Sequence, residues 1–172
     1  MNTPVFGITG WKNSGKTTLV TRLVTEFTER GLRVSTVKHA HHGFDIDKPE
    51  TDSFRHRAAG ACEVLIVSDR RWALMHELRD EPEPPLEAAL ARLSPCDLIL
   101  VEGYKREAHP KIEVRRRGAA SSEPIAPGDP SVVAVAADHD LDTRALPRFG
   151  LDDIAAIADF ISLRFGLAVR NA

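Results

Sequence analysis

Some segments of the chain have the spacing of hydrophobic residues typical of strands and others that typical of helices, and the two kinds alternate along the sequence. An apolar strand is predicted at Val5–Thr9, and a helix is predicted to follow it at Thr17–Glu29. The apolar residues of this helix repeat at core-facing spacing, at Leu19, Val20, Leu23, Val24 and Phe27. Gly31 is placed to end the helix, and Arg33–Lys38 is predicted as the next strand. Because strands joined through such a helix pair in parallel, the pattern predicts a parallel sheet.

The rest of the chain continues this alternation. Further strands are predicted at Glu63–Ser68, Trp72–Met75, Asp97–Gly103, Lys111–Val114 and Val132–Ala136. Further helices are predicted at Phe54–Ala59, at Leu86–Leu93 and from Asp152 onward. The apolar run within Glu63–Ser68 predicts a strand that is buried on both faces. We therefore expect an α/β fold of three layers, with helices on both faces of one mostly parallel sheet, and a single domain over residues 1–172.

Composition narrows the class of protein and of partner. The chain has 172 residues, of which 42% are hydrophobic and 28% charged, and its formal net charge is −2. This balance does not favour nucleic acid or an anionic membrane as a partner. No apolar run has transmembrane length, and we expect no signal peptide, because the first apolar stretch leads straight into a glycine-rich loop. Cys62 and Cys96 form no C-x-x-C pair and border apolar runs, so we expect buried free thiols and a cytoplasmic protein.

The residues between the first strand and the first helix fit the phosphate-binding pattern G-x-x-x-x-G-K-[ST]. They are Gly10, Trp11, Lys12, Asn13, Ser14, Gly15, Lys16 and Thr17, with Thr18 next. We expect the N–H groups of this loop and of the helix N-terminus to surround the phosphates of a nucleotide. Lys16 is expected to neutralise the β- and γ-phosphates, Thr17 to bind Mg²⁺, and Thr18 to contact a further phosphate. The alternative is an ordinary helix start reached by a glycine-rich turn.

Acidic residues in two other places are candidates for the metal. Glu102 follows an apolar strand and precedes Gly103, at the carboxyl edge of the sheet, where ligands of open α/β folds bind. We expect Glu102 to act in catalysis by holding Mg²⁺, directly or through water, or by orienting the attacking water. The alternative is a solvated glutamate at a strand end. Asp47 lies in the loop after the second strand, where a switch element can contact the γ-phosphate or its metal, and a solvated loop acid is an equal alternative. Asp52 shares this position, and for it the favoured prediction is a helix N-cap, with the switch role as the alternative.

Histidine and basic residues gather in other loops. Three histidines lie together after the second strand, at His39, His41 and His42. A structural zinc ion takes four ligands, and the sequence offers no further group at a fitting spacing, so contact with phosphate is the alternative to a metal. The basic segments Lys105–Arg106 and Arg115–Arg117 have no interleaved aromatic residues, so single-stranded nucleic acid is not expected. Asp138 stands where a base-reading loop would lie and could accept guanine N–H groups, although no N-K-x-D motif is present and a solvated loop acid is the alternative.

Several short segments occur together in a specific order. They are the phosphate loop Gly10–Thr18, K-H-x-H-H at Lys38–His42, Asp52–Ser53 with Ala59–Ala61, V-E-G-Y-K at Val101–Lys105, and P-K-I-E at Pro110–Glu113. The phosphate loop is shared by very many proteins, whereas the K-H-x-H-H and V-E-G-Y-K segments after it are much more specific. Over roughly residues 4–165, this combination resembles the molybdopterin-guanine dinucleotide biosynthesis protein B family, MobB.

The resemblance implies a homodimeric protein of the P-loop NTPase type, which binds GTP and Mg²⁺ and hydrolyses GTP weakly. It implies an accessory role in attaching GMP to molybdopterin, with a nucleotidyltransferase of the MobA type as partner and molybdopterin as a further candidate ligand. Some fold relatives carry a second lysine directly after the first glycine of the loop. This chain has Trp11 at that position and a lysine one residue later, at Lys12.

Three other functions share the same loop. A small-molecule kinase would use the basic segments to hold its acceptor. A nucleotide-gated adaptor would use the nucleotide only to fix its conformation. A metallochaperone GTPase would use the histidines. Slow hydrolysis is expected because the loop itself contains no arginine finger, and three arginines are candidates to act across a dimer interface: Arg55, Arg57 and Arg106.

Overall fold

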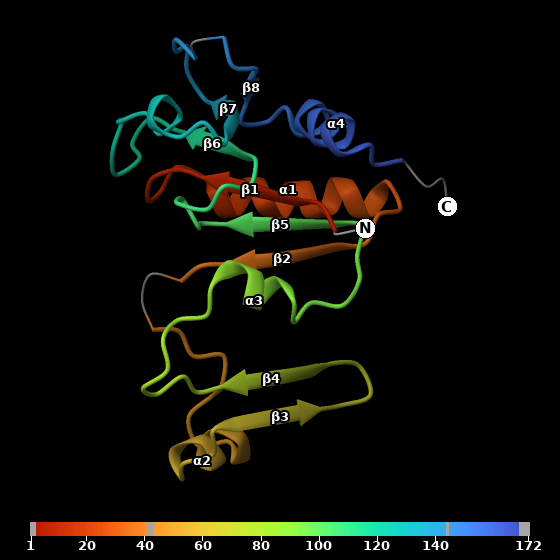
Figure 1. The fold of residues 1–172 in the computed structure, drawn as a ribbon, viewed down its shortest axis with the longest axis vertical. Helices are drawn as coiled ribbons and strands as arrows, with labels where there is room; N and C mark the ends of the chain where they lie inside the picture. The colour runs from red at the N-terminus through yellow and green to blue at the C-terminus, as the bar shows by residue number, and fades with distance from the viewer. Residues whose placement is uncertain (1–2, 41–42, 144, 169–172) are drawn as a thin grey trace. The chain divides into compact units, whose positions relative to one another are not determined.

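The computed structural model describes residues 3–40, 43–143 and 145–168. Contacts within the chain divide it into two compact units (Figure 1). The first consists of Met1–His39 together with Leu86–Ala172, and the second of Ala40–Pro85. The single nucleotide-binding domain over residues 1–172 stays a prediction. No helix in the described ranges is both long and apolar enough to cross a membrane.

The first unit contains a six-stranded sheet in the order β2-β5-β1-β6-β7-β8. Every pairing in it is parallel, which confirms the predicted α/β class. The strands are β1 Val5–Thr9, β2 Val34–Lys38, β5 Leu98–Glu102, β6 Lys111–Arg115, β7 Val132–Ala137 and β8 Arg148–Gly150. The sequence did not predict β8, because three residues are too few to show an alternating pattern.

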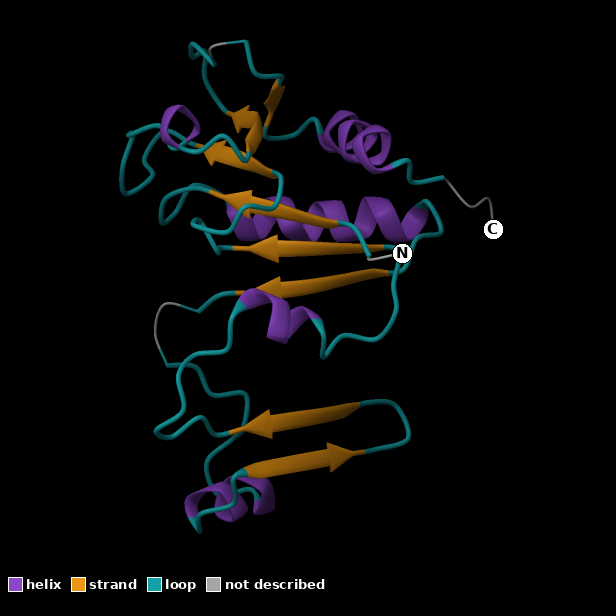
Figure 2. Ribbon diagram, in the orientation of Figure 1, coloured by secondary structure: helices purple, strands orange, loops and turns teal. Residues whose placement is uncertain are grey.

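Helices cover both faces of this sheet, so the three layers are confirmed (Figure 2). The helices of this unit are α1 Lys16–Glu29, α3 Leu86–Leu90, α4 Ile154–Phe165 and the short 3₁₀ helix η1 Ala126–Gly128. Alternate residues of β5 point to opposite faces. Leu98 and Leu100 belong to the core cluster that contains α1 and α4 residues, whereas Ile99 and Val101 pack with Leu86 of α3. Gly31 follows α1 with φ +77°, which confirms the predicted left-handed helix end.

The second unit contains a helix, α2 Asp52–Ala58, and a two-stranded sheet of β3 Glu63–Val67 and β4 Trp72–His76. These strands pair antiparallel, so the prediction of one sheet with β3 buried on both faces is wrong. Only Val64 of β3 is buried. The connection Ser68–Arg71 is too short for a parallel crossover, which needs a dozen or more residues, and a hairpin is therefore the only pairing available to neighbouring strands.

Two local predictions in this part of the sequence are also wrong. Thr51, not Asp52, caps α2: its hydroxyl accepts the N–H of Phe54 (3.4 Å), while Asp52 lies in the first turn. An acidic residue there still interacts favourably with the helix dipole. Cys62 is an exposed free thiol and Cys96 a half-buried one, because apolar neighbours in sequence do not bury a residue at the end of a strand.

Candidate nucleotide site

The phosphate loop lies at the carboxyl edge of the six-stranded sheet, as predicted. It follows β1, which pairs with β5, and β5 in turn pairs with β2, so all three strands end at this edge. Ile8 of β1 is in register with Glu102 of β5, which is in turn in register with Lys38 of β2. Three parallel strands thus deliver the loop, a carboxylate and an ammonium group to one edge of the sheet, where α/β folds bind ligands.

The loop has the backbone of an anion-binding site. Gly10, Asn13 and Gly15 have φ values of +150°, +65° and +97°. Such left-handed residues between ordinary ones turn successive N–H groups toward a common centre. A Cβ at Gly10 would lie 2.5 Å from the Val114 carbonyl oxygen, so glycine is required there. The Lys16 ammonium group donates to the Trp11 carbonyl oxygen (2.8 Å), which places this amine within the loop.

Thr17 and Glu102, the first two predicted metal ligands, are brought together. The Thr17 hydroxyl donates to Glu102 Oε1 (2.8 Å), and Lys38 Nζ lies 3.4 Å from the same oxygen. The carboxylate is nearly buried, with a residue exposure of 9%. A hydroxyl and a carboxylate are hard oxygen ligands of the kind that Mg²⁺ takes, with water and phosphate oxygens supplying the rest. Among the described residues, no group of three or more His, Cys, Asp or Glu side chains could hold a metal ion by itself.

Electrostatics around Lys16 favour an anion. Burial is the main cause that lowers the Lys16 pKa, Glu102 opposes this, and the ammonium groups of Lys105 and Lys38 lower the pKa further. Three ammonium groups therefore act on one small region, and one carboxylate compensates them in part. Phosphate oxygens would supply the negative charge that this region lacks.

Trp11 and Lys12 attach the loop to the segment after β6. The Trp11 indole N–H donates to the Glu123 carbonyl oxygen (2.7 Å), and the Ala120 N–H donates to the Lys12 carbonyl oxygen (2.9 Å). Lys105 Nζ lies 3.9 Å from the centroid of the Trp11 ring. The sequence held no signal for this Lys105–Trp11 pair or for the Lys38–Glu102 pair, because only the strand order makes them neighbours.

A cavity of about 790 Å³ opens beside the other end of the loop. Gly15 and Thr18 line it together with Asp138, which follows β7, and with Arg116 and Arg117, which follow β6. The Asp138 carboxylate accepts the Arg117 N–H (3.0 Å) and pairs with His139 Nδ1 (2.6 Å). The hydrogen bond with His139 is the main cause that lowers the Asp138 pKa, so this carboxylate is ionised. The position predicted for base recognition therefore borders the same cavity as Thr18.

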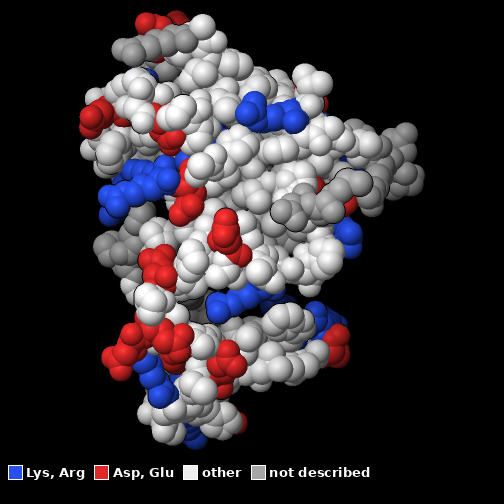
Figure 3. Space-filling model, in the orientation of Figure 1, with Lys and Arg blue, Asp and Glu red and all other residues white. Residues whose placement is uncertain are grey.

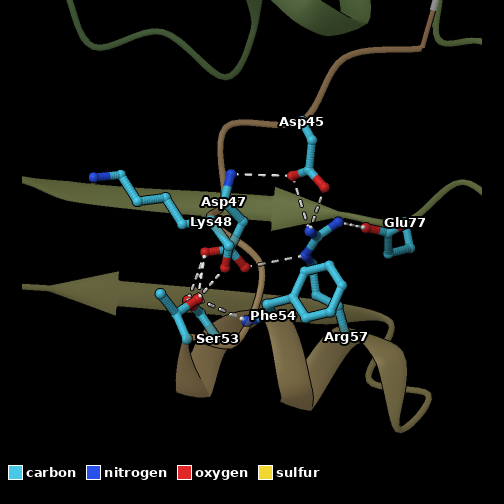
Figure 4. Close-up of polar contacts among 8 residues, drawn as sticks. Asp45, Asp47, Lys48, Ser53, Phe54, Arg57 and Glu77 are labelled. Atoms are coloured by element: carbon cyan, nitrogen blue, oxygen red, sulfur yellow. Dashed lines mark hydrogen bonds and ion pairs between the residues drawn. The ribbon is translucent and has the colours of Figure 1, made fainter.

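Asp47, the third predicted metal ligand, belongs to the second unit, where its carboxylate is already bound (Figure 4). It accepts the Ser53 hydroxyl (2.7 Å) and the Thr51 hydroxyl (3.1 Å), and Arg57 Nε lies 3.3 Å away. Burial opposes its ionisation, but these hydrogen bonds outweigh burial and hold the Asp47 pKa below its ordinary value. A metal would have to replace these partners, and this role for Asp47 stays a prediction.

Arg57 connects three carboxylates of the second unit. Besides Asp47, it contacts Asp45 (2.9 Å) and Glu77 (2.7 Å), and Figure 4 shows its guanidinium group between them. The hydrogen bonds with Glu77 and Asp45 are the largest causes that raise the Arg57 pKa. This network joins the loop before α2 to the end of β4 and occupies one of the arginines proposed as a finger. Of the histidines, His39 packs against Tyr104 with ring centroids 4.9 Å apart, whereas His41 and His42 lie outside the described residues.

Comparison with known proteins gives consistent matches over most of the chain. Residues 5–138 match the model of the family MobB, molybdopterin guanine dinucleotide synthesis protein B. The molybdopterin-guanine dinucleotide biosynthesis adapter protein of Escherichia coli (strain K12) is 39% identical over 160 residues, which cover 92% of this chain and 91% of that protein. The adapter protein of Haemophilus influenzae is 41% identical over 162 residues, which cover 92% and 87% of the two chains.

A solved structure matches at the level of the fold. The crystal structure of a MobB protein homolog from Bacillus stearothermophilus aligns with a TM-score of 0.70 and 29% sequence identity, and the match covers 95% of this chain and 99% of that chain. Its agreement with the parallel sheet described above extends the sequence matches to the three-dimensional structure. With its phosphate loop at the edge of that sheet and the family model matched over residues 5–138, this chain belongs to the MobB family of molybdopterin guanine dinucleotide synthesis proteins.

Proposed function

We propose that this protein is a GTP-binding accessory factor in the attachment of GMP to molybdopterin, with weak, Mg²⁺-dependent GTPase activity. The observation that carries the proposal is the pairing of the Lys16-containing loop with the Thr17–Glu102 contact in a chain of the MobB family. The names of the two relatives, both called adapter proteins, support an accessory role beside a nucleotidyltransferase of the MobA type. Molybdopterin is a further proposed ligand.

The loop residues would act on the phosphates by charge and by position. Lys16 and the N–H groups between Gly10 and Thr18 bind the β- and γ-phosphate oxygens. Thr17 and Glu102 hold Mg²⁺, which supplies charge neutralisation at the transferred phosphoryl group. Glu102 is nearly buried beside Thr17, so its carboxylate is held in place before the nucleotide arrives. Lys16 and Glu102 are therefore the proposed catalytic residues.

The cavity beside Thr18 is the proposed site of the base and ribose. Its volume of about 790 Å³ is within the range of small-molecule sites. Asp138 is ionised there and uses only part of its acceptor capacity on Arg117 and His139, because a carboxylate offers about four lone-pair sites. Guanine presents two neighbouring N–H donors at N1 and N2, whereas adenine presents an acceptor at N1. Asp138 would therefore favour guanine.

Calorimetric titration with non-hydrolysable analogues of GTP and ATP, with and without Mg²⁺, tests this function. We expect the GTP analogue to bind with a lower Kd than the ATP analogue, by about tenfold for one added charge-assisted hydrogen bond. Mg²⁺ is expected to lower the Kd of the triphosphate. Equal affinity for the two analogues would contradict base recognition by Asp138, and absence of binding to both would contradict the proposed function as a whole.

The exposed face of the β3–β4 hairpin supports the proposed homodimer. Leu65 is paired with Leu74 and Val67 with Trp72, and the alternation of side chains puts these four residues on one face. Their exposures are 60%, 48%, 67% and 63%, while Val64 and Met75 of the opposite face are buried. A contiguous apolar patch of this kind marks an interaction surface. A second copy of the chain offers a surface of the same apolar chemistry, as a two-fold interface requires.

A double substitution of this face is expected to give monomers. Leu65→Lys with Leu74→Lys places two like charges on each half of the proposed interface. It also removes two exposed leucines that the interface would bury, each worth up to about 1.5–3 kcal/mol on full burial. We expect the dimer dissociation constant to rise by about 100-fold or more, as measured by sedimentation equilibrium. Leu163→Lys, at a leucine of α4 that is 86% exposed, is the matched control and should leave the dimer intact. A double variant that remains dimeric would place the interface elsewhere.

A cytoplasmic location remains part of the proposal. The free thiols of Cys62 and Cys96 agree with a reducing compartment, where unpaired cysteines persist.

A further inference from the structure

We propose that Lys105, whose ammonium group packs over the ring of Trp11, binds the terminal phosphate of a nucleoside triphosphate held by the phosphate loop of the same chain. The inference rests on the proposed nucleotide-binding function and adds to it a residue that distinguishes triphosphate from diphosphate. The ammonium group of Lys105 lies 3.9 Å from the centroid of the Trp11 ring, and Trp11 is the second residue of the phosphate loop.

The backbone of Lys105 is held firmly. It follows Gly103 and Tyr104, which have φ values of +96° and +47° and turn the chain sharply after β5. The Lys105 carbonyl oxygen accepts the ammonium group of Lys111 (3.1 Å). Lys111 is completely buried and also lies 3.2 Å from Asp129 Oδ2, so this anchor is itself fixed. The backbone of Lys105 is therefore anchored by this turn and by the hydrogen bond from Lys111.

The Trp11 ring is a platform that keeps the Lys105 ammonium group beside the loop. The indole N–H is fixed by the Glu123 carbonyl oxygen (2.7 Å), which sets the orientation of the ring. A cation above an aromatic ring gains only about 0.5–1 kcal/mol at an exposed site. A charge-assisted hydrogen bond to phosphate is worth about 1.5–3 kcal/mol, so an arriving phosphate would draw the ammonium group from the ring.

The ammonium group of Lys105 is available to bind an anion at this edge of the sheet. Among the described residues, no ion pair joins it to a carboxylate. Burial is the main cause that lowers its pKa, and Glu113 opposes this at longer range. Lysine and arginine side chains gather where β1 and β5 end (Figure 3). A phosphate would supply the counter-charge that the protein does not.

The contacts of Lys105 with the start of the loop decide which phosphate it meets. The cavity proposed for the base is lined by residues that follow β6 and β7, on one side of β1. Lys105 follows Glu102 of β5, but it contacts Trp11 and the buried Lys111 of β6, so it lies over the end of β1 beside the start of the loop. A nucleotide with its base in the cavity beside Gly15 and Thr18 would present its terminal phosphate toward the start of the loop, where Trp11 and Lys105 lie. The Lys16 amine is expected to reach the β- and γ-phosphates. It donates to the carbonyl oxygen of Trp11, and the ring of the same residue contacts the Lys105 ammonium group.

Substitution of Lys105 tests the assignment through the contrast between two ligands. Lys105→Met keeps the length of the side chain and removes the charge. We expect it to raise the Kd of guanosine 5′-(β,γ-imido)triphosphate by about tenfold or more and that of GDP by less than about threefold, in calorimetry with Mg²⁺. Lys105→Arg, which keeps the charge and also stacks on Trp, should leave both values within about threefold of the wild type. Arg92→Ala is the control for net charge, because it removes an exposed cation from the segment before β5.

Tryptophan fluorescence provides a second measurement. The chain has two tryptophans, so Trp11 alone reports in a Trp72→Phe background. The triphosphate analogue is expected to change the Trp11 emission as the cation leaves the ring, GDP is expected to change it less, and Lys105→Met should remove this difference. Thermal unfolding confirms that each variant is folded.

The possible outcomes separate the inference from the function on which it rests. Wild-type protein that binds neither nucleotide would overturn both. Wild-type protein that binds both, with Lys105→Met weakening the two ligands equally or not at all, would overturn the role of Lys105 and leave the proposed function standing.

Discussion

Lys16→Ala is expected to raise the Kd for GTP by about 100-fold or more. The Lys16 amine lies inside the phosphate loop, on the Trp11 carbonyl oxygen, and would contact both the β- and the γ-phosphate. Each charge-assisted hydrogen bond contributes about 1.5–3 kcal/mol, and two of them correspond to at least a 100-fold change. Burial and the neighbouring lysines lower the Lys16 pKa, so the free protein holds this charge at some cost that phosphate would relieve. Calorimetric titration measures the change directly.

The matched control for Lys16→Ala is Arg164→Ala. Arg164 is an exposed cation in the last turn of α4, so its loss changes the net charge equally without touching the loop. Its Kd for GTP should stay at the wild-type value. An unchanged Kd in Lys16→Ala would mean that the loop does not bind the phosphates. If Lys16→Ala abolishes binding but the variant still supports cofactor maturation, the nucleotide is dispensable and the adaptor function gains support.

Glu102→Gln is expected to weaken the Mg²⁺ dependence of GTP binding and to slow hydrolysis. The carboxylate oxygen that accepts the Thr17 hydroxyl at 2.8 Å becomes part of a neutral amide of the same size. Loss of a group that hydrogen-bonds a metal ligand, as Glu102 does with Thr17, typically costs about 10–100-fold in metal affinity or activity. We expect a rise of that size in the Mg²⁺ concentration needed for half-maximal hydrolysis, measured by phosphate release over a Mg²⁺ titration.

Two comparisons make the Glu102 result interpretable. Glu87→Gln removes an exposed carboxylate from the first turn of α3 and should leave the Mg²⁺ titration unchanged. Glu102→Gln also leaves Lys38 without its partner at 3.4 Å, and the Lys38→Met variant measures that part of the effect separately. A Mg²⁺ titration of Glu102→Gln that overlays the wild type would show that Glu102 only holds Thr17 and Lys38 in place.

Most strands and helices were predictable from the sequence because their patterns are local. β1 was predicted at Val5–Thr9 and is found there, and α1 begins one residue before the predicted helix. The error at Glu63–Val67 has a physical cause: an apolar run looks the same whether it lies inside a sheet or on an uncovered hairpin face. Thr51 and Asp52 are both good caps, and Thr51 caps α2 because its backbone is extended, whereas Asp52 is already helical.

The sequence by itself determined the chemistry of the phosphate loop. The pattern of glycines, Lys16 and Thr17 lies within eight consecutive residues, and the position of Glu102 at a strand end is also a local feature, so the sequence alone predicts their proposed roles. Only the tertiary structure decided which distant residues complete the site. The strand order β2-β5-β1 is not the order of the chain, so it alone brings Lys38 to Glu102 and Lys105 to Trp11. Contacts of this kind depend on the pairing of strands far apart in sequence, and no local pattern of residues encodes them.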